Sequence, residues 1–141
     1  MELRETPLAA RHLSLGARLV PFSGWNMPVQ YSGIVEEHKA VRERAGLFDV
    51  SHMGRFVVRG AKALSDLEAL TSNRVSKLVI GQFQYSSLPN ERGGLTDDIL
   101  VGRTGETEYQ VVVNAGNLAV DRDQIKAGLS SETEFVDESL T

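Results

Sequence analysis

The sequence predicts an α+β protein in which helices flank an antiparallel sheet. Stretches with apolar residues at helical spacing alternate with short strand-like stretches. Three strand-like stretches also follow one another with turns of only a few residues between them, which is typical of an antiparallel meander. With 141 residues, of which 41% are hydrophobic and 24% charged, the chain has the composition of a folded globular domain.

Composition also excludes several classes of function. The net charge is −4 and the basic residues are scattered, which argues against a general nucleic-acid surface. The sequence has no cysteine, so it forms no disulfide and no thiolate metal site. No apolar run approaches the roughly 18 residues of a spanning helix, and the N-terminus has no signal-peptide core. We therefore expect a soluble, cytoplasmic protein.

The first part of the chain predicts a helix, a strand and a loop. Thr6-Pro7 suits a helix start and Gly16 a helix end. The apolar stretch 17–22 predicts a strand, and the turn-rich stretch 23–28 predicts a loop. That loop contains the only tryptophan, Trp25, which we expect to cover the edge of a core.

A second helix is predicted from Ser32, as its cap, to Gly46. One face of this helix carries Ile34, His38, Val41 and Ala45. The next stretch, 47–54 (LFDVSHMG), has no strong periodicity and predicts an irregular loop whose polar side chains bond its own backbone. Its Asp, Ser and His are too close in sequence to form a catalytic triad.

The rest of the chain predicts the meander and its helices. The elements are a strand at 55–59, a helix around 63–70, strands at 82–88, 95–103 and 108–114, a helix at 117–127, and an extended segment at 134–137. That last segment ends without an obvious partner, so we expect the chain to be cut from a longer one.

Two acids, Asp97 and Asp98, stand at the start of one strand although Asp is depleted in strands. They follow a turn, Asn90 to Gly94, whose paired glycines tolerate positive φ. Successive strand residues point to opposite faces, which disfavours a two-carboxylate acid/base pair. Periodicity leaves open which acid faces a pocket, and the alternative is that both are solvated hairpin residues.

A single carboxylate here has useful neighbours. Tyr85 lies on the preceding strand and Asn114 ends the following one. An acid, an aromatic ring and an amide suit a flat, nitrogen-rich heterocycle. The histidines lack metal-ligand spacing, so we expect no metal, and Gly93-Gly94 leads into a strand rather than a phosphate-binding helix.

Three motifs occur in a specific order: FSGWNMPVQY at 22–31, AGLFDVSHMG at 45–54 and GGLTDD at 93–98. With them the chain resembles, nearly end to end, the N-terminal part of the glycine cleavage system T-protein, a tetrahydrofolate-dependent aminomethyltransferase. Sarcosine and dimethylglycine dehydrogenases carry similar folate domains, as do folate-binding iron–sulfur assembly proteins. The fit of the second and third motifs favours the T-protein over the iron–sulfur assembly proteins.

The resemblance implies a reaction of glycine catabolism and one-carbon metabolism. The family transfers a one-carbon unit from the aminomethyl-lipoyl arm of the H-protein to tetrahydrofolate and releases ammonia. It implies that Asp98 is catalytic and makes the folate N10 a better nucleophile. Met53, Tyr85, Asn114 and the backbone around Val113 match positions that line the folate pocket.

The resemblance also sets expectations for the fold. It implies a partial, truncated T-protein fold, with residues 1–54 in an incomplete first lobe and 55–141 in a second lobe whose C-terminal end is cut. The family is more than twice as long, and its later segments supply further pocket residues. We therefore expect the isolated chain to be inactive. The alternatives are a non-catalytic folate-binding or interaction module, and a bare structural fragment with exposed apolar surface.

Overall fold

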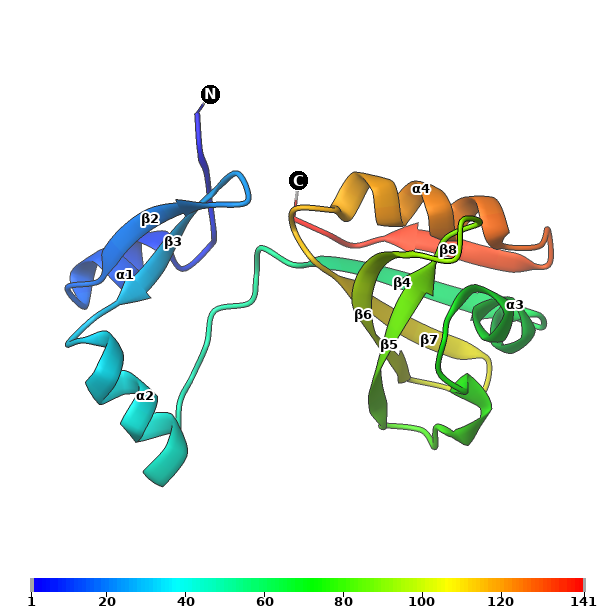
Figure 1. The fold of residues 1–141 in the computed structure, drawn as a ribbon, viewed down its shortest axis with the longest axis horizontal. Coiled ribbons are helices and arrows are strands. Elements are labelled where there is room, and N and C mark those ends of the chain that lie inside the picture. Colours follow the sequence, from blue (N-terminus) through cyan, green and yellow to red (C-terminus); the bar gives the residue numbers. More distant parts are fainter. Residues whose placement is uncertain (1, 141) are drawn as a thin grey trace. The chain divides into compact units, whose positions relative to one another are not determined.

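The computed structural model describes residues 2–140, and the chain divides into two compact units, Met1–His52 and Met53–Thr141. We call them the N-terminal unit and the C-terminal unit and describe each by itself (Figure 1). The class is α+β, as predicted, with mainly antiparallel sheets and flanking helices. The assignment of residues 1–54 and 55–141 to two lobes stays a prediction.

The N-terminal unit is a three-stranded sheet with two helices. Its elements are β1 (Arg4–Glu5), α1 (Ala9–Ser14), β2 (Arg18–Phe22), β3 (Trp25–Gln30) and α2 (Ile34–Glu43). The strand order is β1-β3-β2, in which β1 pairs parallel to β3 and β2 pairs antiparallel to it.

The predicted loop at 23–28 is wrong, because the chain turns only at Ser23-Gly24 and re-enters the sheet as β3. Ser23 and Gly24 both have positive φ, 48° and 82°, which makes the turn tight. Trp25 is only 2% exposed, and the Arg4 guanidinium lies 4.4 Å from the centre of its ring. Tertiary packing of the tryptophan therefore outweighs the turn-forming residues around it.

The predicted cap of α2 by Ser32 is also wrong. The helix starts after Gly33, and no side chain of the N-cap residue bonds it. Instead the Glu37 carboxylate accepts backbone N–H bonds from Tyr31, Ser32 and Gly33, at 2.7, 2.9 and 3.0 Å. These bonds lower the pKa of Glu37, and the bond from Gly33 has the largest effect. A carboxylate one turn into the helix thus supplies the acceptor that free N–H groups at a helix start require.

The C-terminal unit is a five-stranded antiparallel sheet with its helices (Figure 1). Its elements are β4 (Gly54–Gly60), α3 (Ala63–Leu70), the 3-10 turn η1 (Val75–Lys77), β5 (Phe83–Pro89), β6 (Leu95–Arg103), β7 (Glu108–Val113), α4 (Leu118–Gly128) and β8 (Thr133–Asp137). The strand order is β5-β6-β7-β4-β8. The predicted meander β5-β6-β7 is confirmed.

The expectation that the last strand lacks a partner is wrong. β8 pairs antiparallel with β4, from Phe56 opposite Asp137 to Gly60 opposite Thr133. The two strands are about 75 residues apart in sequence. They are also joined by an ion pair, in which the Arg59 Nε lies 2.8 Å from the Glu134 Oε2. A periodic pattern identifies a strand but not a partner that distant in sequence.

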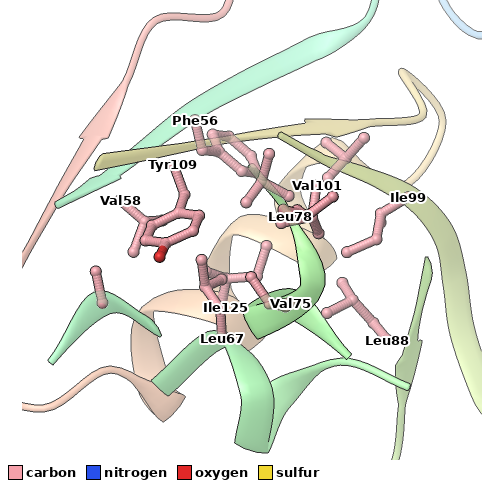
Figure 2. Packing of buried hydrophobic residues seen from close by; sticks show 13 residues of the cluster. Phe56, Val58, Leu67, Val75, Leu78, Leu88, Ile99, Val101, Tyr109 and Ile125 are labelled. Atoms are coloured by element: carbon pink, nitrogen blue, oxygen red, sulfur yellow. The ribbon is translucent and has the colours of Figure 1, made fainter. Parts of the chain in front are cut away.

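The core of the C-terminal unit lies between the sheet and the helices α3 and α4. Alternate residues of β4 and β7 are buried, and those with apolar side chains form part of this core. Figure 2 shows Leu67 of α3 and Ile125 of α4 near the strand residues Val58 and Tyr109. All four are at most 1% exposed. This core fixes the sheet on which the predicted site residues lie.

Leu67→Ala tests this core. Loss of the fully buried side chain should lower the free energy of unfolding by about 2–5 kcal/mol, as measured by urea denaturation. The control Val79→Ala removes a side chain that is 67% exposed and should change that free energy by less than about 0.5 kcal/mol. Equal losses in the two variants would contradict the assignment of the core.

Candidate functional site

The turn before β6 determines where its acids begin. The Asn90 N–H donates to the Gly94 carbonyl at 2.8 Å, and the Asn90 Oδ1 accepts the N–H groups of Arg92 and Gly94, each at 3.1 Å. Gly93 has φ +78°, a left-handed conformation that favours glycine. The asparagine side chain thus closes the turn and delivers the chain into β6 in a defined register.

Strand alternation separates the two acids, as predicted. Asp97 is partly buried and lies on the same side of β6 as the buried residues Ile99 and Val101. Asp98 is exposed on the opposite face. The two carboxylates therefore have different environments although they are adjacent in sequence.

Asn114 contacts both acids. Its Nδ2 donates to the Asp97 Oδ1 at 3.0 Å, to the Asp98 carbonyl at 3.1 Å and to the Asp98 Oδ1 at 3.4 Å. The Asp98 N–H also donates to the Asp97 Oδ1, at 3.0 Å. The amide of Asn114 therefore holds the Asp98 carboxylate and backbone in one arrangement.

The sheet register brings other predicted residues near these two. Tyr85 pairs with Leu100, and Leu100 pairs with Val112, so these three form a row across β5, β6 and β7, two residues along from Asp98 and Asn114. Tyr85 is 71% exposed, so its ring is free to meet a ligand. The predicted aromatic, acid and amide therefore lie on one face of one sheet.

The remaining two predicted residues lie at the same end of the sheet. Met53 directly precedes Gly54, which pairs with Val113. The Val113 side chain is fully buried in the core, so only its backbone is available to a ligand. That all five residues line a folate site stays a prediction.

The structure also shows a residue that the sequence analysis missed, Asp121 in the first turn of α4. Its side chain is fully buried, and burial, followed by its hydrogen bond and charge interaction with Asp97, raises the pKa of Asp121 to about 7. Burial also opposes ionisation of Asp97, but hydrogen bonds, first that from Asn114, lower the pKa of Asp97. The spacing in the sequence could have indicated this burial, because Asp121 lies on the same helix face as the apolar residues Leu118 and Ile125.

The loop 47–54, of which residues 47–52 belong to the N-terminal unit, is irregular up to β4, as predicted. Its Asp49 does bond its own backbone, through the Ser51 N–H at 2.9 Å. Asp49 also accepts bonds from Thr6 and His12, both at 2.7 Å, which the sequence analysis did not foresee. Burial opposes ionisation of Asp49, but hydrogen bonds from the side chains of Ser51, His12 and Thr6, in that order, and then from the Ser51 backbone, hold its pKa well below the usual range. Asp49 thus anchors the loop to the start of the chain.

The three residues that superficially suggest a triad do not form one. Ser51 donates its backbone N–H to Asp49, and the histidine that bonds Asp49 is His12 rather than His52. The His52 ring packs edge-on against Phe22, with ring centres 5.7 Å apart. Burial lowers the pKa of His52. The negative charge of Asp49 acts in the opposite direction, but its effect is smaller.

A cavity of about 530 Å³ also lies in the N-terminal unit, lined mainly by apolar residues of β3, α2 and the loop after α2.

Within residues 2–140, no group of three or more histidine, aspartate or glutamate side chains has an arrangement that could hold a metal ion. No helix in the described part of the chain is long and apolar enough to cross a membrane.

Residues 8–140 match the family described as the GCVT N-terminal domain. The chain belongs to this family. It is 60% identical over 121 residues to an aminomethyltransferase of Deinococcus deserti, and this match covers 86% of the chain and 33% of the relative. It is 55% identical over 125 residues to an aminomethyltransferase of Thermus thermophilus, covering 89% of the chain and 36% of the relative.

A solved structure gives the same result for the fold. The chain superposes on the glycine cleavage system aminomethyltransferase T of Bartonella henselae with a TM-score of 0.89 and 37% identity, over 96% of the chain and 38% of that protein. The chain therefore has the fold of this part of a glycine cleavage T-protein. It spans about a third of the length of the curated relatives that it matches.

Asn114→Ala tests the contact that joins the two acids. Without the amide donor the pKa of Asp97 should rise towards its ordinary value, because the first of the bonds that favour its ionised form is lost. The pKa is measured by carboxyl ¹³C NMR during a pH titration. The control Gln110→Ala, on the face of β7 that Asn114 continues directly after the strand, should leave the pKa of Asp97 unchanged. An unchanged pKa in Asn114→Ala would contradict the proposed contact.

Proposed function

We propose that this chain forms part of a tetrahydrofolate-dependent aminomethyltransferase of the glycine cleavage system. Its donor is the aminomethyl group on the lipoyl arm of the H-protein, and its acceptor is tetrahydrofolate. Family membership and the shared name of the relatives support this proposal. The single observation that carries the site is an exposed carboxylate, Asp98, held by Asn114 on the face that also bears Tyr85.

The reaction needs no oxidant or reductant. The transferred carbon loses its bond to the lipoyl sulfur and its bond to the amine nitrogen, and it gains bonds to N5 and N10 of the folate. The two protons lost from those nitrogens go to the sulfur and to the ammonia that leaves. The products are methylenetetrahydrofolate, the dihydrolipoyl H-protein and ammonia.

Asp98 suits a role at the nucleophilic nitrogen. A carboxylate that accepts a hydrogen bond from the folate N10 raises the electron density on that nitrogen and can take up its proton. The bonds from Asn114 fix one side of Asp98, while its exposure leaves the carboxylate accessible to a ligand.

The other residues suit binding of the flat pterin and its linker. The exposed ring of Tyr85 offers a stacking surface. Met53 offers an adaptable apolar contact, and the backbone at Val113 and the amide of Asn114 offer hydrogen-bonding groups. No metal enters this scheme.

Asp98→Asn in the full-length protein should keep tetrahydrofolate binding and lower kcat by roughly 10²- to 10⁴-fold, because the amide keeps the shape but cannot act as a base. Turnover is measured with aminomethylated H-protein, and folate binding by calorimetry. The control Glu91→Gln changes an exposed acid of the preceding turn and should leave kcat unchanged. Full turnover in Asp98→Asn together with its loss in Asp97→Asn would reverse the assignment.

The 141 residues on their own should transfer no measurable one-carbon unit, because they span only about a third of the relatives' length. The same assay, with the full-length protein as a positive control, tests this expectation. Saturable tetrahydrofolate binding without turnover would favour a non-catalytic folate-binding module for these residues. Clear turnover by the 141 residues would overturn the expectation.

A further inference from the structure

Asp121 is a buried acid, and no neighbouring donor among the described residues forms a hydrogen bond with its carboxyl group. Its exposure is 0%, and neither of its carboxyl oxygens accepts a bond from an N–H or O–H donor of residues 2–140. The Oδ2 of Asp97 is likewise buried and without such a donor. An isolated buried carboxylate is strongly disfavoured, and Asp97 is the group whose hydrogen bond and charge act on Asp121, so these atoms can satisfy one another.

Asp97 and Asp121 can do so only by sharing a proton. Ionised carboxylates are acceptors, and a hydrogen bond between two of them requires that one be protonated. Asp97 is the better anion, because its Oδ1 already accepts bonds from Asn114 and from the Asp98 backbone. The proton therefore belongs on Asp121, in agreement with the opposite directions of the two pKa shifts.

We propose that protonated Asp121 is a positioning residue, which donates to Asp97 and thereby fixes the Asp97–Asn114 contacts that hold Asp98 in place. The chain of contacts is short. Asp121 bonds Asp97, the Asp97 Oδ1 bonds Asn114 and the Asp98 N–H, and Asn114 bonds Asp98. The catalytic meaning of this arrangement rests on the proposed function, but the shared proton does not.

Loss of that proton should disturb the site. Two adjacent carboxylates then repel each other in a buried place. Within residues 2–140, Asp97 on β6 is the ionisable group whose charge acts on Asp121. On α4 itself, Arg122 and Asp123 pair with each other at 3.0 Å, where Asp123 is 70% exposed. From α3, the described contact with the end of α4 is apolar, between Leu70 and Gly128.

The proton is tested directly by carboxyl ¹³C and amide NMR of the chain during a pH titration. We expect Asp121 to titrate near pH 7, and the Asp98 amide to shift with the same midpoint. Unfolding by urea gives a second measure. Between the ordinary aspartate pKa of 3.8 and about 7, the folded chain binds this proton and the unfolded chain does not, so stability should fall as pH rises. Titration of Asp121 near pH 4 would overturn the proposal.

Variants of the full-length protein test the positioning role. We expect kcat of the wild type to decline above pH 7. Asp121→Asn keeps a donor to Asp97, so it should retain kcat at pH 7 and lose that decline. Asp121→Leu removes the donor and should lower kcat roughly 10- to 100-fold with KM for tetrahydrofolate little changed. The exposed control Asp123→Asn should behave as wild type.

The outcomes separate the two proposals. If the wild-type full-length protein does not turn over, the proposed function fails while the NMR titration still decides the shared proton. If Asp121→Leu does not fold, the pH profile of Asp121→Asn decides the positioning role. A folded Asp121→Leu with wild-type kcat, or an Asp121→Asn profile identical to wild type, would overturn that role.

Discussion

The side-chain amide of Asn114 is the contact on which the candidate site depends. One nitrogen donates to Asp97, on the core side of β6, and to Asp98, on its exposed side. A carboxamide suits this position because its N–H groups bind acceptors without adding a charge. A carboxylate there would place three acids together, and an alanine would leave the partly buried Asp97 without its first stabilising bond.

That contact in turn requires the register between β6 and β7. Leu100 lies opposite Val112 and Val101 opposite Val111, and the same register places Asp98 beside Asn114. A slip of one residue would turn the buried residues Val111 and Val101 away from the core. The hydrophobic alternation that holds the C-terminal unit together therefore also determines which acid meets the amide.

Local signals predicted the elements well where pattern and packing agree. β6 has the predicted bounds, 95–103, and the meander and α4 lie within a residue of their predicted positions. Periodicity also separated Asp97 from Asp98, because strand alternation is a purely local property. The roles of the candidate residues came instead from the resemblance to a known family.

The errors share one physical cause, which is contact between residues far apart in sequence. Trp25 is buried in a strand where turn-forming neighbours predicted a loop. β8 pairs with β4 across the whole C-terminal unit. Asp49 bonds His12, 37 residues earlier. Asp121 interacts with the distant Asp97, yet in sequence it is only a polar residue in a helix, and nothing local indicates that its stripe faces another acid.

Asp97 and Asp121 show why this region is not built for stability alone. A leucine at 121 would extend the apolar stripe of Leu118 and Ile125 and avoid the burial of a carboxyl group. Asp at 97 is likewise a poor strand residue. Each acid is tolerable only in the presence of the other, because one proton between them satisfies both. Asp97 and Asp121 are each unfavourable in their own strand or helix, and each offsets the cost of the other. They lie next to the exposed Asp98, and residues that conflict with local preference in this way are expected at a functional site. The pair therefore supports, independently of any resemblance, the proposal that the functional site lies at the start of β6.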